Sequence, residues 1–415
     1  MILDYFVTKN PDNFLLPAKG KMKKFVVFGA GNIGRGFFAQ LFFEAGYETV
    51  FVDINETIVN ELNKRRGFTI KIVGAKEREI SVKNVRAING RDLAAVADEL
   101  LNADLAATAV GVNVLNNICP ALAAGIKLRA DLGVTLPLNI IVGENMINAG
   151  AFVKQKVKTK LGPKYDDYIE EFAGFVETVL GRMIPVMPEA LRSRDPLYIM
   201  VEEFCTLPIA KHSFKGKVPD IQNLLPAEQF LSFEERKLYI HNLGHSVCAY
   251  LGFLKKYEFI REAVEDKEIK KYVKGAMLET GRAIIKKHNL PEKEVLDYID
   301  DLLERFANKS LGDTVARVGR DPVRKLGPED RFAGSARLVA EFGFKPENIS
   351  YGMAASLFFN PPDDEAAAKI QKILKDKGPG GVLKEITGLE PGNELYNKVI
   401  EKYNILKAKY SKGEA

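Results

Sequence analysis

Residues 24–53 read KFVVFGAGNIGRGFFAQLFFEAGYETVFVD, and this stretch decides the fold of the first part of the chain. The wholly apolar run 25–28 is typical of a strand that is buried on both faces of a parallel sheet. The glycine pattern GAGNIG at 29–34 follows directly, and apolar residues at helical spacing continue to Gly46, a suitable helix end. A second apolar run and a final carboxylate, residues 49–53, complete the order of one βαβ unit.

This order is typical of a dinucleotide-binding unit, in which each glycine has its own task. The first permits the tight turn, the second lets the backbone approach a pyrophosphate, and the third allows the helix to pack against the strand. A carboxylate at the end of the second strand accepts hydrogen bonds from the ribose hydroxyls of NAD and would repel the extra phosphate of NADP. The sequence therefore predicts NAD. The expected cofactor-binding residues are Gly29, Ala30, Gly31, Asn32, Ile33, Gly34, Arg35 and Asp53.

One nearby cation leaves an alternative open. Arg35 could soften the discrimination by Asp53 against NADP, or it could simply flank the pyrophosphate.

Length and composition limit the class of protein. A chain of 415 residues with 46% hydrophobic and 28% charged residues is typical of a globular protein with two or more domains. The net charge of +5 is mild and the cations are interspersed with acids, so nucleic acid is not an expected partner. No apolar run approaches the ~20 residues of a membrane span. The three cysteines are too scattered for a CxxC motif and fit a reducing cytoplasm.

Beyond residue 53 the α/β pattern continues and then changes. Strands are expected at 67–73, 79–88, 104–110 and 138–142, of which the first two could pair as a hairpin, and a helix is expected at 113–132. Prolines punctuate a connecting region between residues 185 and 226. Helical periodicity then dominates, over 228–251, 267–288, 291–307, 364–377 and 393–409.

The predicted fold is therefore α/β: a Rossmann-like N-terminal domain with a parallel sheet, followed by an all-α C-terminal domain. We place the N-terminal domain at residues 22–205 and the C-terminal domain at 206–415. Residues 1–21 precede the first strand as an extension to which we assign no function.

The first long helix of the second domain carries the strongest candidate for chemistry. Residues 236–245 read RKLYIHNLGH, with the spacing Lys237-x4-Asn242-x2-His245. At ~100° per residue these side chains and His241 project from one broad face. A core face would carry aliphatic residues, and a solvated face would normally carry Glu and Lys pairs. Spacing alone still leaves open that this is an ordinary solvated polar face.

Several segments together resemble the polyol-specific long-chain dehydrogenases. They are GAGNIGRGF in the glycine turn, LNIIVGEN at 138–145 and KLYIHNLGHSVCAYLG at 237–252. DPLYIMVEEF, HSFKGKVPDI and RVGRDPVRKLGPEDR, which begin at residues 195, 212 and 317, extend the resemblance over nearly all of 23–405. It implies hydride transfer between NAD and a polyol, specifically the interconversion of mannitol 1-phosphate and fructose 6-phosphate.

The resemblance also implies roles for individual residues. Lys237 would be the general acid/base, Asn145 and Asn242 would polarise the substrate oxygen, and His245 would help to position the substrate. These roles are chemically reasonable because a partly desolvated lysine can titrate near neutrality, and two amides can stabilise negative charge on one oxygen. The four histidines and three cysteines show no zinc-ligand spacing, so no metal is expected. Asn145 could alternatively cap the next helix.

A basic run near residue 320 bears on the substrate. Its cations are Arg317, Arg320, Arg324, Lys325 and Arg331, with acids interspersed. Such runs are usually solvated, but a sugar phosphate requires charge-assisted donors. We expect Arg320 and Arg324, four apart, to share a helical face if the stretch is helical, and to bind the phosphate.

Three alternatives remain at the level of sequence. A sibling enzyme acting on an unphosphorylated polyol or a hexuronate would keep the lysine motif and lack a phosphate site. A β-hydroxyacid dehydrogenase also joins a Rossmann domain to helices, but it spaces the polar residues after the lysine more closely. A non-enzymatic NAD sensor would have no need of Lys237, Asn242 and Asn145 together.

Overall fold

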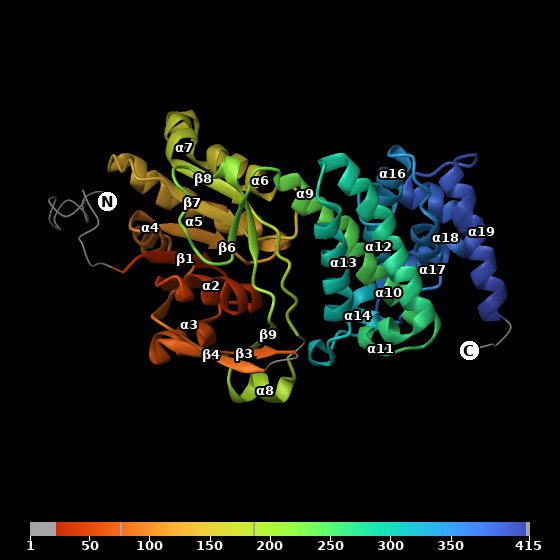
Figure 1. Cartoon of the computed structure of the whole chain (residues 1–415). Helices are drawn as coiled ribbons and strands as arrows, with labels where there is room; N and C mark the ends of the chain where they lie inside the picture. The colour runs from red at the N-terminus through yellow and green to blue at the C-terminus, as the bar shows by residue number, and fades with distance from the viewer. Residues whose placement is uncertain (1–21, 75–76, 186, 412–415) are drawn as a thin grey trace. The chain divides into compact units, whose positions relative to one another are not determined.

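The computed structural model describes residues 22–74, 77–185 and 187–411 (Figure 1), so the predicted extension 1–21 lies outside it. The chain divides into two units, of which the first ends at Phe230 and the second begins at Leu231. The sequence places the domain boundary earlier, at residues 205 and 206. The structure keeps the intervening segment with the first unit because it contains the parallel pair β10 (Leu207–Ala210) and β11 (Leu224–Ala227), and Ile209 bridges Thr178.

A six-stranded sheet forms the centre of the first unit. Its strand order is β5-β2-β1-β6-β7-β8, and every neighbouring pair is parallel, which is the order of a Rossmann sheet. The order reverses at β1, so the crevice beyond the carboxyl ends of β1 and β6 is the expected ligand site. The strands are β1 (Lys24–Phe28), β2 (Glu48–Asp53), β5 (Val85–Asn89), β6 (Leu105–Thr108), β7 (Leu138–Val142) and β8 (Ala173–Glu177).

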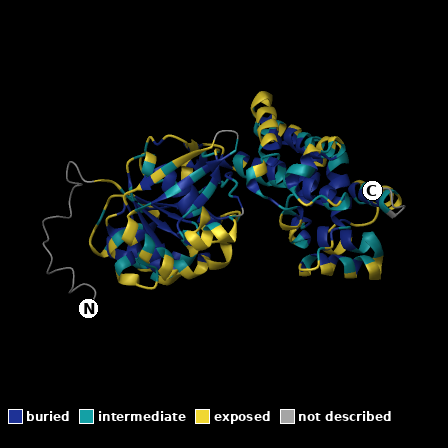
Figure 2. Cartoon of the chain, turned by 90° about the horizontal axis from the view of Figure 1, so that it is seen from below, coloured by how far each residue is buried: buried dark blue, intermediate teal, exposed yellow. Residues whose placement is uncertain are grey.

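Two apolar cores cover the faces of this sheet, as the alternation of side chains along β1 requires. Phe25 and Val27 belong to one core, with side chains of η2 (Gly34–Phe38) and α2 (Ala39–Glu44). Val26 and Phe28 belong to the other, with side chains of α7 (Asp166–Phe172) and of three longer helices. These helices are α4 (Leu93–Leu101), α5 (Val112–Asp131) and α6 (Ala149–Leu161). Figure 2 shows the strands of this unit buried and the outer faces of its helices exposed.

A second, three-stranded sheet accompanies the main one. The hairpin expected from the sequence is present, with β3 (Gly67–Val73) antiparallel to β4 (Arg78–Lys83). The single strand expected at 79–88 is wrong, because Asn84 adopts a left-handed conformation (φ 55°) and separates β4 from β5. The region expected only to connect the domains contributes β9 (Ile199–Glu202), which pairs with β3. The remaining helical segments are α3 (Glu56–Arg65), η3 (Pro163–Tyr165), α8 (Glu189–Arg194) and η4 (Lys211–Ser213).

The second unit is built from helices. Its central helix, α10 (Leu243–Leu254), is buried along most of its length and packs against α12 (Lys267–His288), α14 (Val315–Gly319) and α17 (Glu347–Ser356). It continues α9 (Phe230–Glu235) and the π-helical turn η5 (Arg236–Asn242). The others are α11 (Ile260–Glu265), α13 (Glu292–Phe306), η6 (Lys309–Leu311), α15 (Pro322–Lys325), α16 (Ala333–Glu341), α18 (Glu365–Val382), η7 (Leu383–Thr387) and α19 (Glu394–Ser411).

Candidate active site

The three glycines of the turn after β1 meet different surroundings. Gly29 has φ 100°, and a Cβ there would clash with the carbonyl oxygen of Ala109. A Cβ at Gly34 would clash with the carbonyl oxygen of Gly29. A Cβ at Gly31 would meet no heavy atom within 4 Å. Packing therefore excludes a side chain at Gly29 and at Gly34. The space beside Gly31 is open, as the approach of a pyrophosphate would require.

Asp53, the last residue of β2, lies against this turn. Its Oδ2 accepts a hydrogen bond from the backbone N–H of Ala30 (2.6 Å), and its Oδ1 accepts one from the N–H of Asn55 (2.9 Å). The carboxylate is thus placed at the carboxyl end of the sheet, where a ribose diol could reach it. These residues fit the adenosine half of a dinucleotide.

The side chain of Arg35 makes its hydrogen bonds within the first unit. Its side chain donates from Nε to the carbonyl oxygen of Ala30 (2.6 Å) and from Nη1 to that of Pro196 (3.0 Å). The residue is only 6% exposed, and burial lowers its pKa to about 10, although Asp53 and Asp195 act in the opposite direction. The guanidinium therefore connects the glycine turn to the segment that precedes β9 by hydrogen bonds to both.

The loop after β7 carries Asn145. Its neighbour Glu144 is buried and accepts hydrogen bonds from the N–H groups of Val110 and Gly111, both at 2.9 Å. Burial raises the pKa of Glu144 against the effect of these donors. The carboxylate thereby fastens this loop to the one that precedes α5.

Asn145 itself is exposed and is not a helix cap. The next helix, α6, begins at Ala149, and its N-cap is Asn148. The alternative of an N-cap role for Asn145 is therefore wrong. Its side-chain amide makes no hydrogen bond to any residue in the described part of the chain, so its carbonyl oxygen and its NH2 group are both available to a ligand.

In the second unit, the π-helical turn η5 carries the candidate lysine. The angle of ~100° per residue, with which the sequence places these side chains on one face, holds for an α-helix. A π-helical turn contains more residues, so the angle between successive side chains is smaller here. Lys237 Nζ nevertheless lies 3.0 Å from Nδ1 of His241. His241 is only 2% exposed, so the lysine contacts a buried imidazole. Turns of this kind are often found at functional sites.

Phe306, at the end of α13, packs against both imidazoles of this helix. The ring of His245 stacks on it with centroids 4.7 Å apart, and the ring of His241 meets it edge-on at 5.7 Å. Burial, followed by the charge of Lys237, holds the pKa of each histidine well below its usual value. Both imidazoles are therefore neutral at pH 7.

One nitrogen of His245 lacks a good partner. Its Nε2 lies 3.5 Å from Oδ2 of the buried Asp313, but the geometry does not make a hydrogen bond, and no other described residue supplies one. A buried polar atom in this state is unusual in a folded protein and is consistent with a site that a ligand or water completes.

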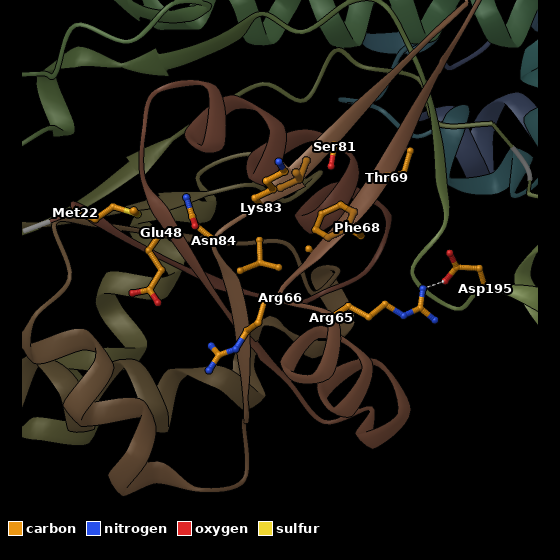
Figure 3. Close-up of a pocket in the computed structure, with 13 residues that line it drawn as sticks. Met22, Glu48, Arg65, Arg66, Phe68, Thr69, Ser81, Lys83, Asn84 and Asp195 are labelled. Atoms are coloured by element: carbon orange, nitrogen blue, oxygen red, sulfur yellow. Dashed lines mark hydrogen bonds and ion pairs between the residues drawn. The ribbon is translucent and has the colours of Figure 1, made fainter.

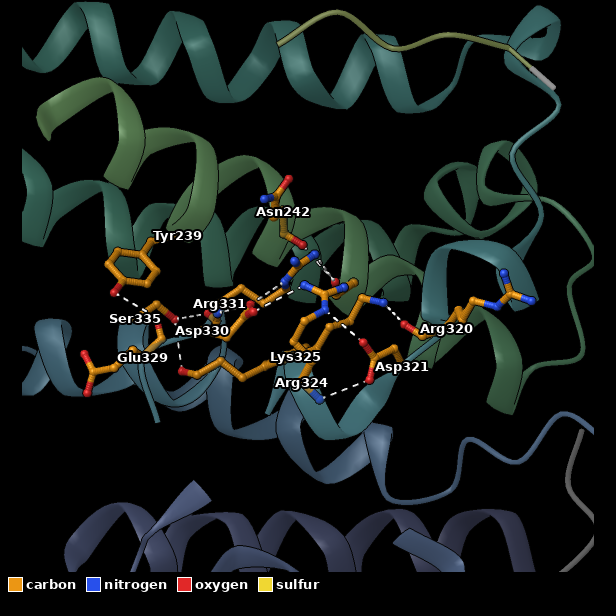
Figure 4. A network of polar contacts seen from close by, with 12 residues as sticks. Tyr239, Asn242, Arg320, Asp321, Arg324, Lys325, Glu329, Asp330, Arg331 and Ser335 are labelled. Atoms are coloured by element: carbon orange, nitrogen blue, oxygen red, sulfur yellow. Dashed lines mark hydrogen bonds and ion pairs between the residues drawn. The ribbon is translucent and has the colours of Figure 1, made fainter. Parts of the chain in front are cut away.

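Asn242 ends the π-turn and joins a polar network (Figure 4). Its carbonyl oxygen accepts a hydrogen bond from the hydroxyl of Ser246 (2.8 Å), and Nη1 of Arg331 donates to the same hydroxyl (3.4 Å). The Asn242 amide points away from this network and makes no hydrogen bond to a described residue. The network links the candidate catalytic helix to the basic run.

The basic run is not one helix, so Arg320 and Arg324 do not share a helical face as expected. Arg320 follows α14, and Asp321 breaks the chain with a left-handed conformation (φ 60°) before α15 begins. Arg324 pairs with Asp321 (2.9 Å) and Asp330 (3.4 Å), whereas the Arg320 guanidinium points away from them in Figure 4.

Lys325 is the most deeply buried cation of this run. It is 5% exposed and donates from Nζ to the carbonyl oxygen of Arg320. Burial lowers its pKa to about 7, and the charges of Arg331 and Arg324 add to the effect. The sequence placed Lys325 in the basic run and His241 on the polar helix face but predicted neither as a site residue, because the signal in both cases is burial, which depends on packing between helices far apart in the chain.

A separate concavity of about 840 Å³ lies in the first unit (Figure 3). Glu48 and Val85, the first residues of β2 and β5, line it together with Arg66 and Phe68. It therefore adjoins the amino ends of these strands, whereas the glycine turn lies at the carboxyl end of β1. It is not part of the dinucleotide site.

No group of three or more His, Cys, Asp or Glu side chains is arranged to hold a metal ion within residues 22–74, 77–185 and 187–411. No helix in the same ranges is sufficiently long and apolar to cross a membrane.

Comparison with known proteins gives the same division of the chain. Residues 23–223 match the Rossmann domain of mannitol dehydrogenases, and residues 229–407 match their C-terminal domain. The mannitol-1-phosphate 5-dehydrogenase of Bacillus licheniformis is 37% identical over 374 residues, which cover 90% of this chain and 97% of that enzyme.

Two solved structures share the fold. A substrate-free D-sorbitol dehydrogenase aligns with a TM-score of 0.80 at 18% identity, covering 95% of each chain. The ternary complex of Pseudomonas fluorescens mannitol 2-dehydrogenase with NAD and D-mannitol aligns with a TM-score of 0.70 at 15% identity, covering 95% of this chain and 92% of that one. With a dinucleotide-binding Rossmann unit and a helical unit that carries the lysine motif, the chain belongs to the mannitol dehydrogenase family.

Proposed function

We propose that the protein catalyses the NAD-dependent, metal-independent interconversion of D-mannitol 1-phosphate and D-fructose 6-phosphate. The observation that carries this proposal is the contact of Lys237 Nζ with a buried, neutral imidazole, on a helix that also presents Asn242 and His245. The 37% identity to a mannitol-1-phosphate 5-dehydrogenase supports the choice of substrate.

The chemistry requires a proton and a hydride to leave the same alcohol. Bound NAD would accept the hydride from the carbinol carbon. The amine of Lys237 takes the hydroxyl proton, and its ammonium form returns that proton to the oxygen when the ketone is reduced. The amides of Asn145 and Asn242 donate hydrogen bonds to this oxygen as negative charge develops on it, and His245 positions the substrate. The lysine thus performs the proton transfer without a metal.

The choice of NAD rests on Asp53 and on the open space beside Gly31. The carboxylate at the end of β2 would accept hydrogen bonds from the ribose hydroxyls, while its charge would repel the phosphate of NADP. The Arg35 guanidinium donates to two backbone carbonyls and also interacts with the charge of Asp53, so the measured cofactor preference decides between discrimination by Asp53 and its weakening by Arg35.

We predict that the enzyme prefers NADH to NADPH and that Asp53→Asn narrows this preference. Asparagine keeps an oxygen that can accept from the Ala30 N–H, so the turn should stay folded while the repelling charge is lost. The measurement is kcat/KM for each cofactor, with the thermal midpoint of the variant as the folding control. Equal use of both cofactors by the unaltered enzyme would contradict the assignment to Asp53.

We predict that Lys237→Ala lowers turnover by about 10²–10⁴-fold, the usual contribution of a positioned acid/base, while NADH still binds. Lys270, an exposed lysine on α12, provides the matched control, and Lys270→Ala should leave turnover unchanged. Prolonged treatment with EDTA should have no effect on the unaltered enzyme. Near-normal turnover of the Lys237 variant, or inactivation by the chelator, would show that the metal-free lysine mechanism is wrong.

The phosphate site is proposed within the basic run. Arg324, Lys325 and Arg331 gather beside the helix of Asn242 in Figure 4, and Arg320 is directed elsewhere. We therefore retain Arg324 as a phosphate ligand, add Lys325 and Arg331 as further candidates, and regard Arg320 as the weaker of the two arginines chosen from the sequence. Each charge-assisted bond to a phosphate is expected to contribute about 1.5–3 kcal/mol.

We predict that fructose is at least ~10²-fold poorer than fructose 6-phosphate in kcat/KM. Arg324→Gln should lower kcat/KM for fructose 6-phosphate by about 10-fold or more without affecting residual activity on fructose, and Arg320→Gln should lower kcat/KM for fructose 6-phosphate by less than Arg324→Gln does. Because Lys325 loses its charge as the pH rises through about 7, KM for fructose 6-phosphate should increase above pH 7. If fructose or a hexuronate equals fructose 6-phosphate as a substrate, the enzyme has a sibling activity and the basic run is a solvated surface.

A further inference from the structure

The proposed reaction does not explain why His241 lies in contact with Lys237. The reaction assigns a proton transfer to Lys237 and a substrate contact to His245, yet the 3.0 Å contact of Nζ is with the imidazole of His241. Lysine reaches its ammonium through four rotatable carbon–carbon bonds, so a base of this type requires something to hold Nζ in place.

The surroundings of His241 make it a neutral and fixed partner. Its side chain is buried, and its ring packs edge-on against Phe306. After burial, the groups with the largest effect on its pKa are Lys237 on η5, Arg305 on α13, His245 on α10 and Arg331, which precedes α16. All of them are cationic or neutral, so burial and charge together favour the uncharged imidazole. A cationic histidine here would repel the ammonium of the lysine.

A neutral imidazole suits both charge states of the lysine. When its proton is on Nε2, the lone pair of Nδ1 can accept an N–H from an ammonium group or from an amine. One N–H of the amine is then directed at His241, and the lone pair of Nζ takes the hydroxyl proton of the substrate. The same contact persists after that proton has been taken, so the base need not move between the two directions of the reaction.

We propose that His241 is the positioning residue of the general base: Nδ1 holds Nζ of Lys237 in one place in both its amine and its ammonium forms. This inference rests on the proposed role of Lys237. His241 takes up no proton and touches no substrate; it acts through the lysine alone. Since a displacement of ~1 Å can cost about 10²-fold in rate, the expected loss on removing the contact is about 10–10²-fold in kcat. KM for fructose 6-phosphate should change little.

A double-mutant cycle tests the inference, with fructose 6-phosphate and NADH as substrates. His241→Leu removes the acceptor while keeping an apolar side chain against Phe306, and it should lower kcat by about 10–10²-fold in the otherwise unaltered enzyme. In the Lys237→Ala background the same substitution should change the residual rate by less than ~2-fold, because there is no longer a base to position. An equal loss in both backgrounds would overturn the inference.

Two further variants separate positioning from simple filling of space. Asparagine at position 241 can place its side-chain oxygen near the position of Nδ1, whereas glutamine places its polar atoms farther out. His241→Asn should therefore restore most of the lost kcat, and His241→Gln should not. Equal kcat for these two variants, at equal thermal midpoints, would also overturn the inference. This comparison remains informative if His241→Leu fails to fold.

The turnover of Lys237→Ala alone distinguishes failure of the proposed lysine base from failure of the positioning role of His241. Near-normal turnover of that variant removes the proposed base, and the inference about His241 falls with it. Strong loss of turnover, combined with equal effects of His241→Leu in both backgrounds, preserves the lysine mechanism and refutes only the positioning role.

Discussion

The turn after β1 leaves no room for a side chain at two of its glycines, and the architecture of the first unit depends on that constraint. The strand is buried on both faces, so the chain must leave it abruptly and return at once as the helical segment η2–α2 that covers one face. A methyl group at Gly29 or Gly34 would strike a backbone carbonyl. Gly31 is under no such constraint. The turn thus satisfies the packing of the fold while leaving one backbone position open toward a ligand.

The second unit places polar side chains of the candidate site within a helical core. Phe306 supplies the apolar surface against which two imidazoles pack, and the resulting burial keeps them neutral beside Lys237. The π-turn η5 interrupts regular helical spacing at the position of the lysine. A lysine in contact with a neutral imidazole suits a group that must both give and accept a proton.

Features that depend on local pattern could be predicted from the sequence, and features that depend on tertiary contacts could not. The β3 strand at 67–73 and the α12 helix at 267–288 were predicted with their observed ends, because apolar spacing and helix-end residues are local signals. The chain breaks at Asn84, between β4 and β5, and at Asp321, between α14 and α15, could not be predicted, since each depends on one residue in a left-handed conformation. Membership of β9 in a sheet with β3 was equally hidden, because it requires a partner more than a hundred residues away in sequence. The same holds for the burial of Lys325 and His241, which changed the set of candidate site residues.

The central claim is that this chain transfers a hydride between NADH and the ketone of fructose 6-phosphate. The most direct measurement is to incubate the purified protein with fructose 6-phosphate and NADH deuterated at the transferred position, and to analyse the product by NMR and mass spectrometry. The account predicts mannitol 1-phosphate with one deuterium on the carbon that was the ketone, formed in equal amount to the oxidised cofactor. Absence of this product, with deuterium transferred instead to fructose or to a hexuronate, would contradict the account.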